Sequence, residues 1–517
     1  MEKNNIIIIV LILLLLPYAF GTFEHFYKSY QYPFQLDETE GYILDQALIF
    51  HNGGNIYKPL DDFPFIVSTY GPVFPYINSF LVDPEFPKFD SGRLLSFLSL
   101  CGILILAILF IKKFTDSIIG GFLFAALYLN SYEVLNWCVY YRVDFLGIFF
   151  SFCGLLIFSY YNDVKRPRLI LFLSALFFAL GFFTKQTQLA APISAVLYLF
   201  LNDKKSAIKN SIIIISPLII IFILLTIITK GQYYLHNVVY NANKFDFWQV
   251  KQMTKNLLWV FNKYTLILMI LLMIFNPQKK NLISIYLYLC LLLIPTIGKV
   301  GSAENYFLEP LLGIYLFICI NFYNIMRFNT VETPYTGVSK ISTISTMPDI
   351  QKGDAHIGRL YKYIETLKTK LPIILTTIAI ILFTTHAYNI ASLHKKFVWV
   401  KEPTTADMMN GDRVLSIIKK HSGDIISEDA AFLILSSREV LYEPFIMSTL
   451  AKEGKWNDKP IIDAIENKRF SLIITTVDLF NKEQFFFNYN TNFIDAVKKN
   501  YHLLEVVGKY YIYCRGE

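Results

Sequence analysis

The chain has 517 residues, of which 54% are hydrophobic and 16% aromatic, and its formal net charge is +7. This composition is far more apolar than that of a soluble domain, so it indicates a polytopic membrane protein. The Lys and Arg residues cluster in short loops between apolar runs, so the positive charge reflects membrane topology, and no nucleic-acid partner is expected. The six cysteines lie mostly inside apolar runs without paired spacing, which indicates neither a disulfide framework nor a metal knuckle.

Eleven apolar runs predict transmembrane helices. They cover residues 6–20, 94–111, 118–129, 145–160, 169–183, 189–201, 212–228, 257–275, 282–297, 306–326 and 371–390. Several are shorter than the roughly 20 residues that a perpendicular helix needs, so their ends must extend into flanking polar residues. The first run also resembles a cleaved signal peptide, but the ten later runs favour an uncleaved helix.

The loops between these runs carry an uneven distribution of Lys and Arg. Alternate loops are basic, at residues 112–113, 165–168, 204–209, 279–280 and 327–370. The positive-inside bias places these five loops in the cytoplasm together with the N-terminus. The loop 21–93 and the C-terminal region are therefore expected outside a cell membrane that the chain crosses many times.

This topology divides the chain into two domains. Residues 1–390 form the transmembrane domain, with the external loop 21–93 and a cytoplasmic insertion, 329–358, whose Thr, Ser, Pro and Gly content predicts a flexible segment. Residues 391–517 alternate short apolar strands with helical pieces, which predicts a small extracytoplasmic α/β domain. Its expected elements are strands at 424–427 and 472–475, a helix at 493–499, and a hairpin at 503–513 about Gly508.

The long external loop contains an acidic cluster, Asp37-Glu38-Thr39-Glu40-Gly41. Apolar residues at helical spacing between residues 40 and 50 predict an amphipathic helix that lies on the membrane surface and holds the cluster against the bilayer. Residues 52–55 should end this helix, and Tyr70-Gly71-Pro72 predicts a stiff turn. The simpler interpretation is a solvated helix start, in which Asp37 or Thr39 caps the helix that Glu40 begins.

Acidic and cationic residues collect at the external face, where charges near membrane depth usually face a polar cavity or a partner. This set consists of Asp37, Glu38, Glu40, Asp45, Arg93, Glu133, Arg142, Asp144, Lys185 and Glu304. Arg142 and Asp144 are two residues apart and do not share a helical face, so pairing within one helix is a poor explanation. A local cap by Asp144, with Arg142 extended to the interface, is the alternative. Lys185 either extends to the interface or attracts a lipid phosphate.

Taken in order, these motifs resemble those of the GT-C superfamily, the membrane glycosyltransferases that include protein O-mannosyltransferases and lipid A aminoarabinose transferases. The matching segments are 37–41, 70–72, 142–144, 184–187 and 304–310, and the tail segments 426–429 and 441–445 are similar to those of bacterial and archaeal members. The resemblance spans nearly the whole chain. It implies a fold of about eleven transmembrane helices and a donor sugar carried on polyprenyl phosphate.

The resemblance also implies roles for individual residues. An acceptor hydroxyl would attack the anomeric carbon with inversion, and Asp37 matches the catalytic first-loop acid of the family, with Glu38 as its nearest rival. Lys185, Arg142 or Arg93 would neutralise the leaving phosphate. The remaining substrate or metal candidates are Asp144, Glu133, Glu304 and Tyr70. Some members use a divalent cation, and carboxylates suit magnesium or manganese, but no dedicated cage is visible, so metal dependence is left open.

The sequence does not identify the sugar or the acceptor, which is a lipid, a glycan or a protein. The extended acceptor motifs of the protein mannosyltransferases are not recognisable, and the tail does not resemble their β-trefoil insert. A lipid-linked glycan transporter or flippase is an alternative, but it should show related repeats, and none is evident. A glycan polymerase or ligase usually relies on external Arg or His, and a non-catalytic assembly protein would not need the acidic cluster. The C-terminal domain, tethered on the catalytic side, is expected to select the acceptor.

Overall fold

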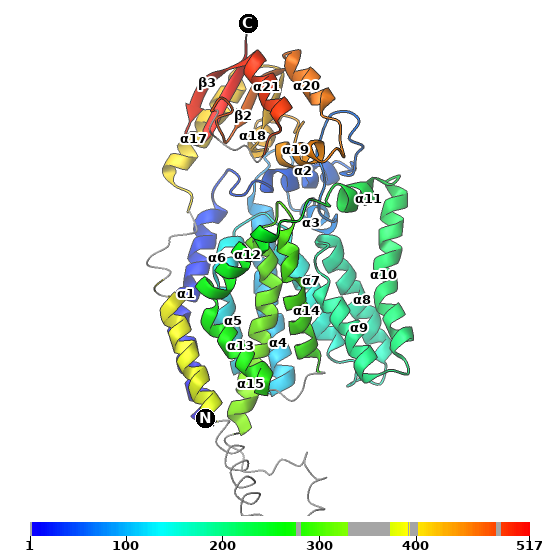
Figure 1. Ribbon diagram of the computed structural model, residues 1–517, viewed down its shortest axis with the longest axis vertical. Helices are drawn as coiled ribbons and strands as arrows, with labels where there is room; N and C mark the ends of the chain where they lie inside the picture. The colour runs from blue at the N-terminus through cyan, green and yellow to red at the C-terminus, as the bar shows by residue number, and fades with distance from the viewer. Residues whose placement is uncertain are drawn as a thin grey trace, which may run out of the picture.

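The computed structural model describes residues 3–275, 281–328, 373–390, 392, 402–481 and 488–516. These residues form a bundle of helices with a small sheet domain at one end, and part of the first loop lies between the two (Figure 1). The insertion expected at 329–358 lies outside the described residues.

Each of the eleven apolar runs coincides with helical structure over most of its length. The helices are α1 (Lys3–Tyr30), α4 (Asp90–Thr115), α5 (Ile119–Leu129), α7 (Asp144–Phe158), α8 (Pro167–Thr184), α9 (Ala190–Asn202), α10 (Ala207–Ile228), η2 (Asn256–Phe261) with α13 (Lys263–Phe275), α14 (Leu282–Leu293), α15 (Leu308–Phe328) and the helix Ile373–Ile390. Six described helices are long and apolar enough to cross a membrane, and a pair bent by 90°, Phe247–Phe261 with Lys263–Phe275, is a seventh candidate. The chain is therefore a multi-pass membrane protein, while the count of eleven spans stays a prediction.

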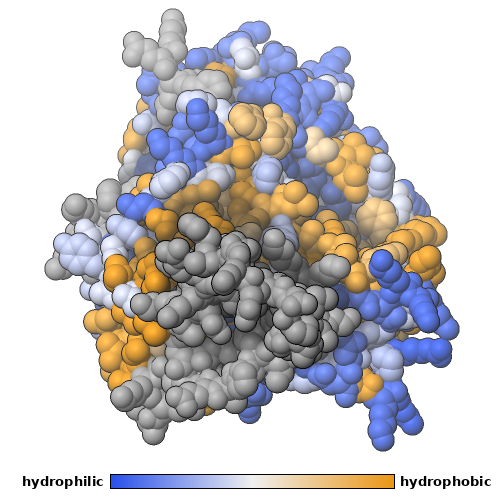
Figure 2. Space-filling model, turned by 60° about the horizontal axis from the view of Figure 1, so that its bottom comes forward, coloured by the Kyte–Doolittle hydropathy of each residue, from blue (hydrophilic) through white to orange (hydrophobic). Residues whose placement is uncertain are grey.

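The surface of the bundle is apolar where it would meet lipid. Helix α10 leaves Ile212, Ile220 and Ile228 exposed, and Figure 2 shows hydrophobic side chains around the flanks of the molecule. A helix that is apolar all round needs an apolar solvent or a protein interior. Helix α15 lies in the protein interior, because it packs against α5, α13 and α14 and buries Tyr315 and Phe317.

Helix α7 brings the functional ends of several helices together. It packs against α4, α8 and α9. Its first residue is Asp144, and the last residue of α8 is Thr184, so Lys185 follows directly. These termini lie at the end of the bundle that carries the sheet domain (Figure 1). The predicted turn after Thr184 is thus confirmed, and α9 begins at Ala190.

The first loop contains two short helices, α2 (Glu40–His51) and α3 (Val73–Asn78). The predicted end of the first helix is confirmed, since Asn52 follows α2 as its C-terminal cap. The predicted position on the membrane surface is wrong, because α2 packs Tyr42 and Leu44 in one cluster with Ala431 and Phe432 of the sheet domain. The apolar face of α2 is thus covered by protein.

The sheet domain contains four strands in the order β1-β2-β4-β3. The strands are β1 (Asp424–Ser427), β2 (Phe470–Thr475), β3 (Tyr501–Val507) and β4 (Tyr510–Arg515), and the helices are α17 (Thr405–Lys420), α18 (Ala431–Leu435), α19 (Pro444–Lys452), α20 (Lys459–Glu466) and α21 (Thr491–Asn500). Strands β1 and β2 are parallel, and the other two pairs are antiparallel. The predicted strands, helix and hairpin are confirmed, the hairpin turning at Gly508 with a positive φ of 59°.

Gly71, in the predicted Tyr70-Gly71-Pro72 turn, lies directly against the end of α8. A Cβ atom at this position would meet the carbonyl oxygen of Phe183 at 1.8 Å, so only glycine fits. We expect Gly71→Ala to lower the free energy of unfolding by about 1–3 kcal/mol or more, because the backbone must move apart. Thermal unfolding of the purified protein measures this. Gly21→Ala is the control, since its Cβ would meet nothing within 4 Å; equal melting temperatures for the two variants would contradict the close approach.

Candidate functional site

A buried ion pair shapes the acidic loop. Arg93 is 0% exposed, and its Nε and Nη2 donate to the two carboxylate oxygens of Glu40 at 3.1 and 2.9 Å. Its remaining hydrogens reach the backbone carbonyls of Ser29, Tyr32 and Phe34 at 3.1, 2.6 and 2.7 Å. A buried guanidinium needs this many acceptors, because each unpaired donor would cost free energy. The chain must therefore turn around Arg93 between the end of α1 and the start of α2.

The Glu40 carboxylate also fixes two neighbouring backbone segments. It accepts the amide of Leu36 at 2.5 Å and the amide of Tyr141 at 2.6 Å. The first contact closes the acidic loop, and the second joins it to the segment that leads into α7. Glu40 therefore sets the distance between Asp37 and Arg142.

Asp37 projects from this loop onto Arg142. Its Oδ1 accepts from Arg142 Nη1 at 2.6 Å and from the Thr39 amide at 3.1 Å. Its Oδ2 has no hydrogen-bond donor among the described residues, and the side chain is 21% exposed. Thr39 stands at the N-cap of α2 without a capping side-chain bond, whereas Asp37 accepts the Thr39 amide just before the helix. The capping interpretation thus describes one contact of Asp37 but does not explain its ion pair with Arg142.

Charges of alternating sign continue from Arg142. Its Nη2 donates to the Tyr70 hydroxyl at 2.9 Å, and its Nε lies 3.5 Å from Asp144. Asp144 is buried and also accepts from Lys185 Nζ at 2.5 Å and from the Asn305 amide at 2.8 Å. Pairing within one helix was a poor explanation, and the contact is indeed not of that kind, because Arg142 precedes α7 and reaches Asp144 from outside the helix.

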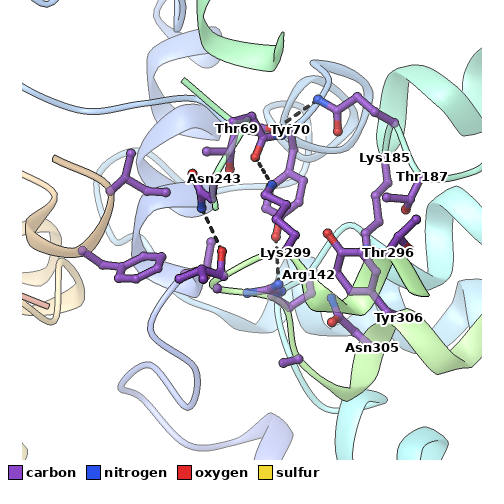
Figure 3. A pocket seen from close by; sticks show the side chains of 18 of the residues that line it. Thr69, Tyr70, Arg142, Lys185, Thr187, Asn243, Thr296, Lys299, Asn305 and Tyr306 are labelled. Atoms are coloured by element: carbon purple, nitrogen blue, oxygen red, sulfur yellow. Dashed lines mark hydrogen bonds between the residues drawn. The ribbon is translucent and has the colours of Figure 1, made fainter. Parts of the chain in front are cut away.

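These residues surround a cavity of about 640 Å³ at the end of the bundle. Its lining comes from the first loop, the turns after α6 (Tyr132–Trp137) and α8, the segments 241–245 and 295–306, and the sheet domain; among the residues are Asp37, Glu38, Tyr70, Arg142, Lys185, Asn243, Lys299, Tyr306, Glu443 and Phe445. Figure 3 shows Lys185, Thr187 and Tyr306 on one side, Asn243 on the other, and Lys299 between them. The cavity is large enough for a sugar and a phosphate group.

Lys299 is the cavity residue that sequence reasoning missed. Its Nζ donates to Asn241 Oδ1, and no carboxylate pairs with it in the described parts of the chain. Burial lowers the pKa of Lys299, and the charge of Lys185 acts in the same direction. The sequence could have indicated Lys299, because it lies between the predicted spans 282–297 and 306–326, in a loop opposite to the basic loops on either side. Lys185 lies 4.5 Å from the centre of the Tyr306 ring, so the cavity has a cationic side built by Lys185 and Lys299.

Two carboxyl groups face the cavity nearer the sheet domain. Glu38 reaches the cavity space, but the walls around it and the carboxylates of Glu428 and Asp37 raise its pKa to about 8. Burial likewise raises the pKa of Glu443 to about 8, although its bond from the Val67 amide acts in the opposite direction. These shifts favour the protonated form of both groups. The lysine side is thus positive, while this side carries less negative charge than two free carboxylates would.

The structure does not bring every predicted residue to the cavity. Arg93 lies outside it, with its donors already engaged by Glu40 and the backbone, so it is not available to a phosphate. Glu133 is buried apart from the cavity, with no partner for its Oε2 among the described residues, and Glu304 is not in the lining. Tyr70 is present, and Asp144 acts from behind Arg142 and Lys185.

The carboxylates do not fit a divalent cation. The described residues contain no group of three or more His, Cys, Asp or Glu side chains that could hold a metal ion. Both oxygens of Asp144 already receive bonds from Arg142, Lys185 and Asn305. A metal at this position would replace cations that are built into the protein, so we derive no step through a metal.

The sheet domain holds the acidic loop from the other side. The Gln35 side chain donates to Asp429 Oδ1 at 2.9 Å and accepts from the Ala431 amide at 3.1 Å. The second oxygen of Asp429 accepts from the Tyr510 hydroxyl at 2.8 Å. A Cβ on Gly41 would meet the Ala431 nitrogen at 2.8 Å, so α2 and the sheet domain touch directly. The loop carrying Asp37 is therefore clamped between two surfaces.

A family model matches part of the chain. Residues 70–229 match the family model for dolichyl-phosphate-mannose-protein mannosyltransferase, a segment that contains Tyr70, Arg142, Asp144 and Lys185. No curated protein sequence is significantly similar to the chain.

Solved structures share the fold at low identity. The crystal structure of ArnT from Cupriavidus metallidurans bound to undecaprenyl phosphate aligns with a TM-score of 0.56 at 9% identity, covering 97% of each chain. The archaeal oligosaccharyltransferase AglB from Archaeoglobus fulgidus, in complex with an inhibitory peptide and a dolichol-phosphate, aligns with a TM-score of 0.52 at 10% identity, covering 90% of this chain and 69% of the other.

The buried ion pair makes a direct prediction about stability. Arg93→Met leaves Glu40 buried without its cation, so we expect a loss of about 3–5 kcal/mol in unfolding free energy. Arg93→Met combined with Glu40→Met removes both charges and should recover part of that loss, because no unpaired charge remains. Thermal unfolding of the purified variants measures both, with the exposed Lys88→Met as control. A double variant no more stable than the single one would contradict the pairing argument.

Proposed function

We propose that the chain is a membrane glycosyltransferase of the GT-C superfamily, and that it moves a sugar from a polyprenyl-phosphate donor to an acceptor hydroxyl. The observation that carries the proposal is that Asp37, Lys185 and Lys299 line one cavity. A base on one side and fixed cations on the other suit a displacement in which a proton and a phosphate leave in different directions.

The cationic side is the proposed phosphate site. Lysine binds phosphate well as a point charge, and fixed cations stabilise the negative charge that grows as the phosphate leaves. Lys299 has no competing carboxylate among the described residues, whereas Lys185 shares Asp144. We therefore assign the first contact with phosphate to Lys299, with Lys185 and Arg142 beside it. The two neighbouring structures that carry undecaprenyl phosphate and dolichol-phosphate support this class of donor.

Asp37 is the proposed base. Arg142 holds its Oδ1 at 2.6 Å and so orients the carboxylate, while Oδ2 has no described partner and can accept a proton. Glu38 is the weaker candidate, because its pKa of about 8 leaves it protonated at neutral pH. The acceptor oxygen forms a bond to the anomeric carbon as its proton passes to Asp37 Oδ2. The bond from that carbon to the phosphate oxygen breaks, and polyprenyl phosphate leaves with the electron pair, so the configuration inverts.

The proposed topology places this site at the external membrane face. The N-terminus is cytoplasmic in this arrangement, because the described basic loops 112–113, 165–168 and 204–209 lie at the opposite end of the helices from the site. Residues 1–390 would supply the donor site and the base, and residues 391–517 would form the extracytoplasmic domain above them. The lipid tail of the donor stays in the bilayer next to the cavity.

Replacing the base tests the chemical step. We expect Asp37→Asn to reduce transfer about 10²- to 10⁴-fold, the usual contribution of general-base catalysis, because the amide cannot take the proton. Membranes with matched amounts of protein are tested for transfer from a panel of labelled polyprenyl-phosphate sugars to endogenous acceptors. Binding of undecaprenyl phosphate should be retained.

The control for that experiment is Asp83→Asn, an exposed residue of the same loop. It should transfer sugar at the wild-type rate. Equal transfer by wild type and Asp37→Asn would remove Asp37 from the reaction. No transfer by the wild type from any donor would contradict the proposed function itself.

The cavity should bind phosphate less tightly at alkaline pH. Glu38 is uncharged below its pKa of about 8 and becomes negative above it, so rising pH adds a charge that repels phosphate. We expect the affinity for undecaprenyl phosphate to fall as the pH passes through about 8. Titrations of the protein in lipid nanodiscs measure this. Glu38→Gln should show a smaller fall, and an unchanged pH profile in that variant would show that Glu38 is not its source.

A further inference from the structure

One wall of the cavity is built by the sheet domain, and its backbone is fixed. Phe65 donates to the Leu441 carbonyl at 2.8 Å, and Glu443 donates to the Phe65 carbonyl at 3.0 Å. These bonds form a parallel bridge between Phe65 and Tyr442. Helix α19 begins at the next residue, Pro444. Glu443 is therefore held between a strand-like bridge and a helix start, and its side chain cannot move far.

Only one of the two oxygens of the Glu443 carboxyl group has a hydrogen-bond partner among the described residues. Its Oε2 accepts from the Val67 amide at 3.1 Å, while its Oε1 has no partner in the residues that the structure describes. Glu443 is buried and lines the cavity. A carboxyl group that lines a cavity with one oxygen unpaired can bond to a substrate group there.

A second polar atom on this wall is also without a partner. Asn243 donates to the Val300 carbonyl at 2.9 Å, but its Oδ1 is buried and unpaired. Figure 3 places Asn243 across the cavity from Lys185 and Tyr306. Next to it, Phe445 packs so closely on Gly301 that a Cβ there would meet the ring at 2.9 Å. The wall thus combines one apolar ring with two unpaired polar oxygens.

The charge of this wall selects among acceptors. Glu38 and Glu443 stand here, and each becomes negative only above about pH 8. Arg142 and Lys185 are neutralised by Asp37 and Asp144. Lys299 is assigned to the donor. Lys455 stands beside this wall but is paired with Glu453. The described lining residues therefore leave no unpaired cation for an anionic acceptor, whereas a hydroxyl group can donate to Asn243 Oδ1 and accept from a protonated Glu443.

We infer that this wall is the acceptor subsite, that it takes an uncharged, hydroxyl-rich sugar, and that Glu443 is a specificity-determining residue within it. The inference rests on the proposed function, because the acceptor must reach Asp37, which lies on the same side as Glu38. It assigns the sheet domain a direct part in acceptor choice. A phosphorylated acceptor would meet two carboxyl groups and no free cation.

The test measures binding of defined probes to the full chain in nanodiscs that contain undecaprenyl phosphate. Saturation-transfer NMR compares methyl α-mannoside, mannose 6-phosphate and a short serine peptide. We expect methyl α-mannoside to bind most tightly. Preference for the sugar phosphate or for the peptide would overturn the inference.

Variants locate the binding on this wall. Glu443→Leu and Asn243→Ala should each weaken methyl α-mannoside binding about tenfold, the effect of one lost buried hydrogen bond, and leave undecaprenyl phosphate binding unchanged. Glu443→Gln keeps an oxygen for the Val67 amide and stays uncharged, so it should bind within about threefold of wild type. Glu439→Gln, on the exposed surface of the same segment, is the matched control. If Glu443→Leu fails to fold, methyl α-mannoside binding by Asn243→Ala alone tests the inference.

The outcomes separate this inference from the proposed function. Wild-type sugar binding in both Glu443→Leu and Asn243→Ala overturns the acceptor subsite, even where Asp37→Asn abolishes transfer. Loss of sugar binding in these variants supports the subsite. If sugar binding is lost in these variants but Asp37→Asn transfers sugar normally, the sugar-binding subsite is supported and only the role of Asp37 as the base is contradicted.

Discussion

The burial of Arg93 is the constraint on which the site depends. A guanidinium without solvent must be surrounded by acceptors, and the chain supplies them from Glu40 and three carbonyls at the end of α1. This requirement fixes the path of residues 29–40 and leaves Asp37 at the one edge that faces Arg142. The fully buried carboxylate of Glu40 thus has a structural part. Asp37, three residues earlier and partly exposed, is the carboxylate that a substrate could reach. A buried pair is expensive to form, so it specifies one geometry.

The sheet domain completes this constraint. Gln35 bonds to Asp429 and Ala431, and Glu428 is itself held by Thr476, Asn488 and Tyr489. The acidic loop therefore has a rigid partner on each side, the helical bundle below and the sheet domain above. Neither surface alone would hold Asp37 in place, because a loop that packs on only one face can still adopt many conformations. The active geometry is a property of both parts of the chain.

Local patterns in the sequence were sufficient to predict the helices, the strands and part of the candidate site. Apolar runs and the 424–427 strand depend on nearby residues, and the external position of Asp37, Arg142 and Lys185 followed from the charge of the loops. Arg93 was misassigned because its partner Glu40 lies 53 residues away and hydropathy does not report pairing. The apolar face of α2 was assigned to lipid because a sequence pattern cannot distinguish lipid from a protein partner such as Phe432. Glu443 enters the cavity only through a bridge to Phe65.

The pairing of Asp37 with Arg142 links the two halves of the proposed reaction. Before transfer, Arg142 is balanced by Asp37 at 2.6 Å and by Asp144 at 3.5 Å, so it attracts phosphate weakly. When Asp37 accepts the proton of the acceptor, it loses its charge, and the positive charge of Arg142 is less fully balanced. Only Asp144 then remains beside Arg142, and this happens as the phosphate gains negative charge in the same cavity. Proton transfer on one side would thus strengthen the stabilisation of the leaving group on the other, which is the arrangement that favours the transition state over the bound substrates.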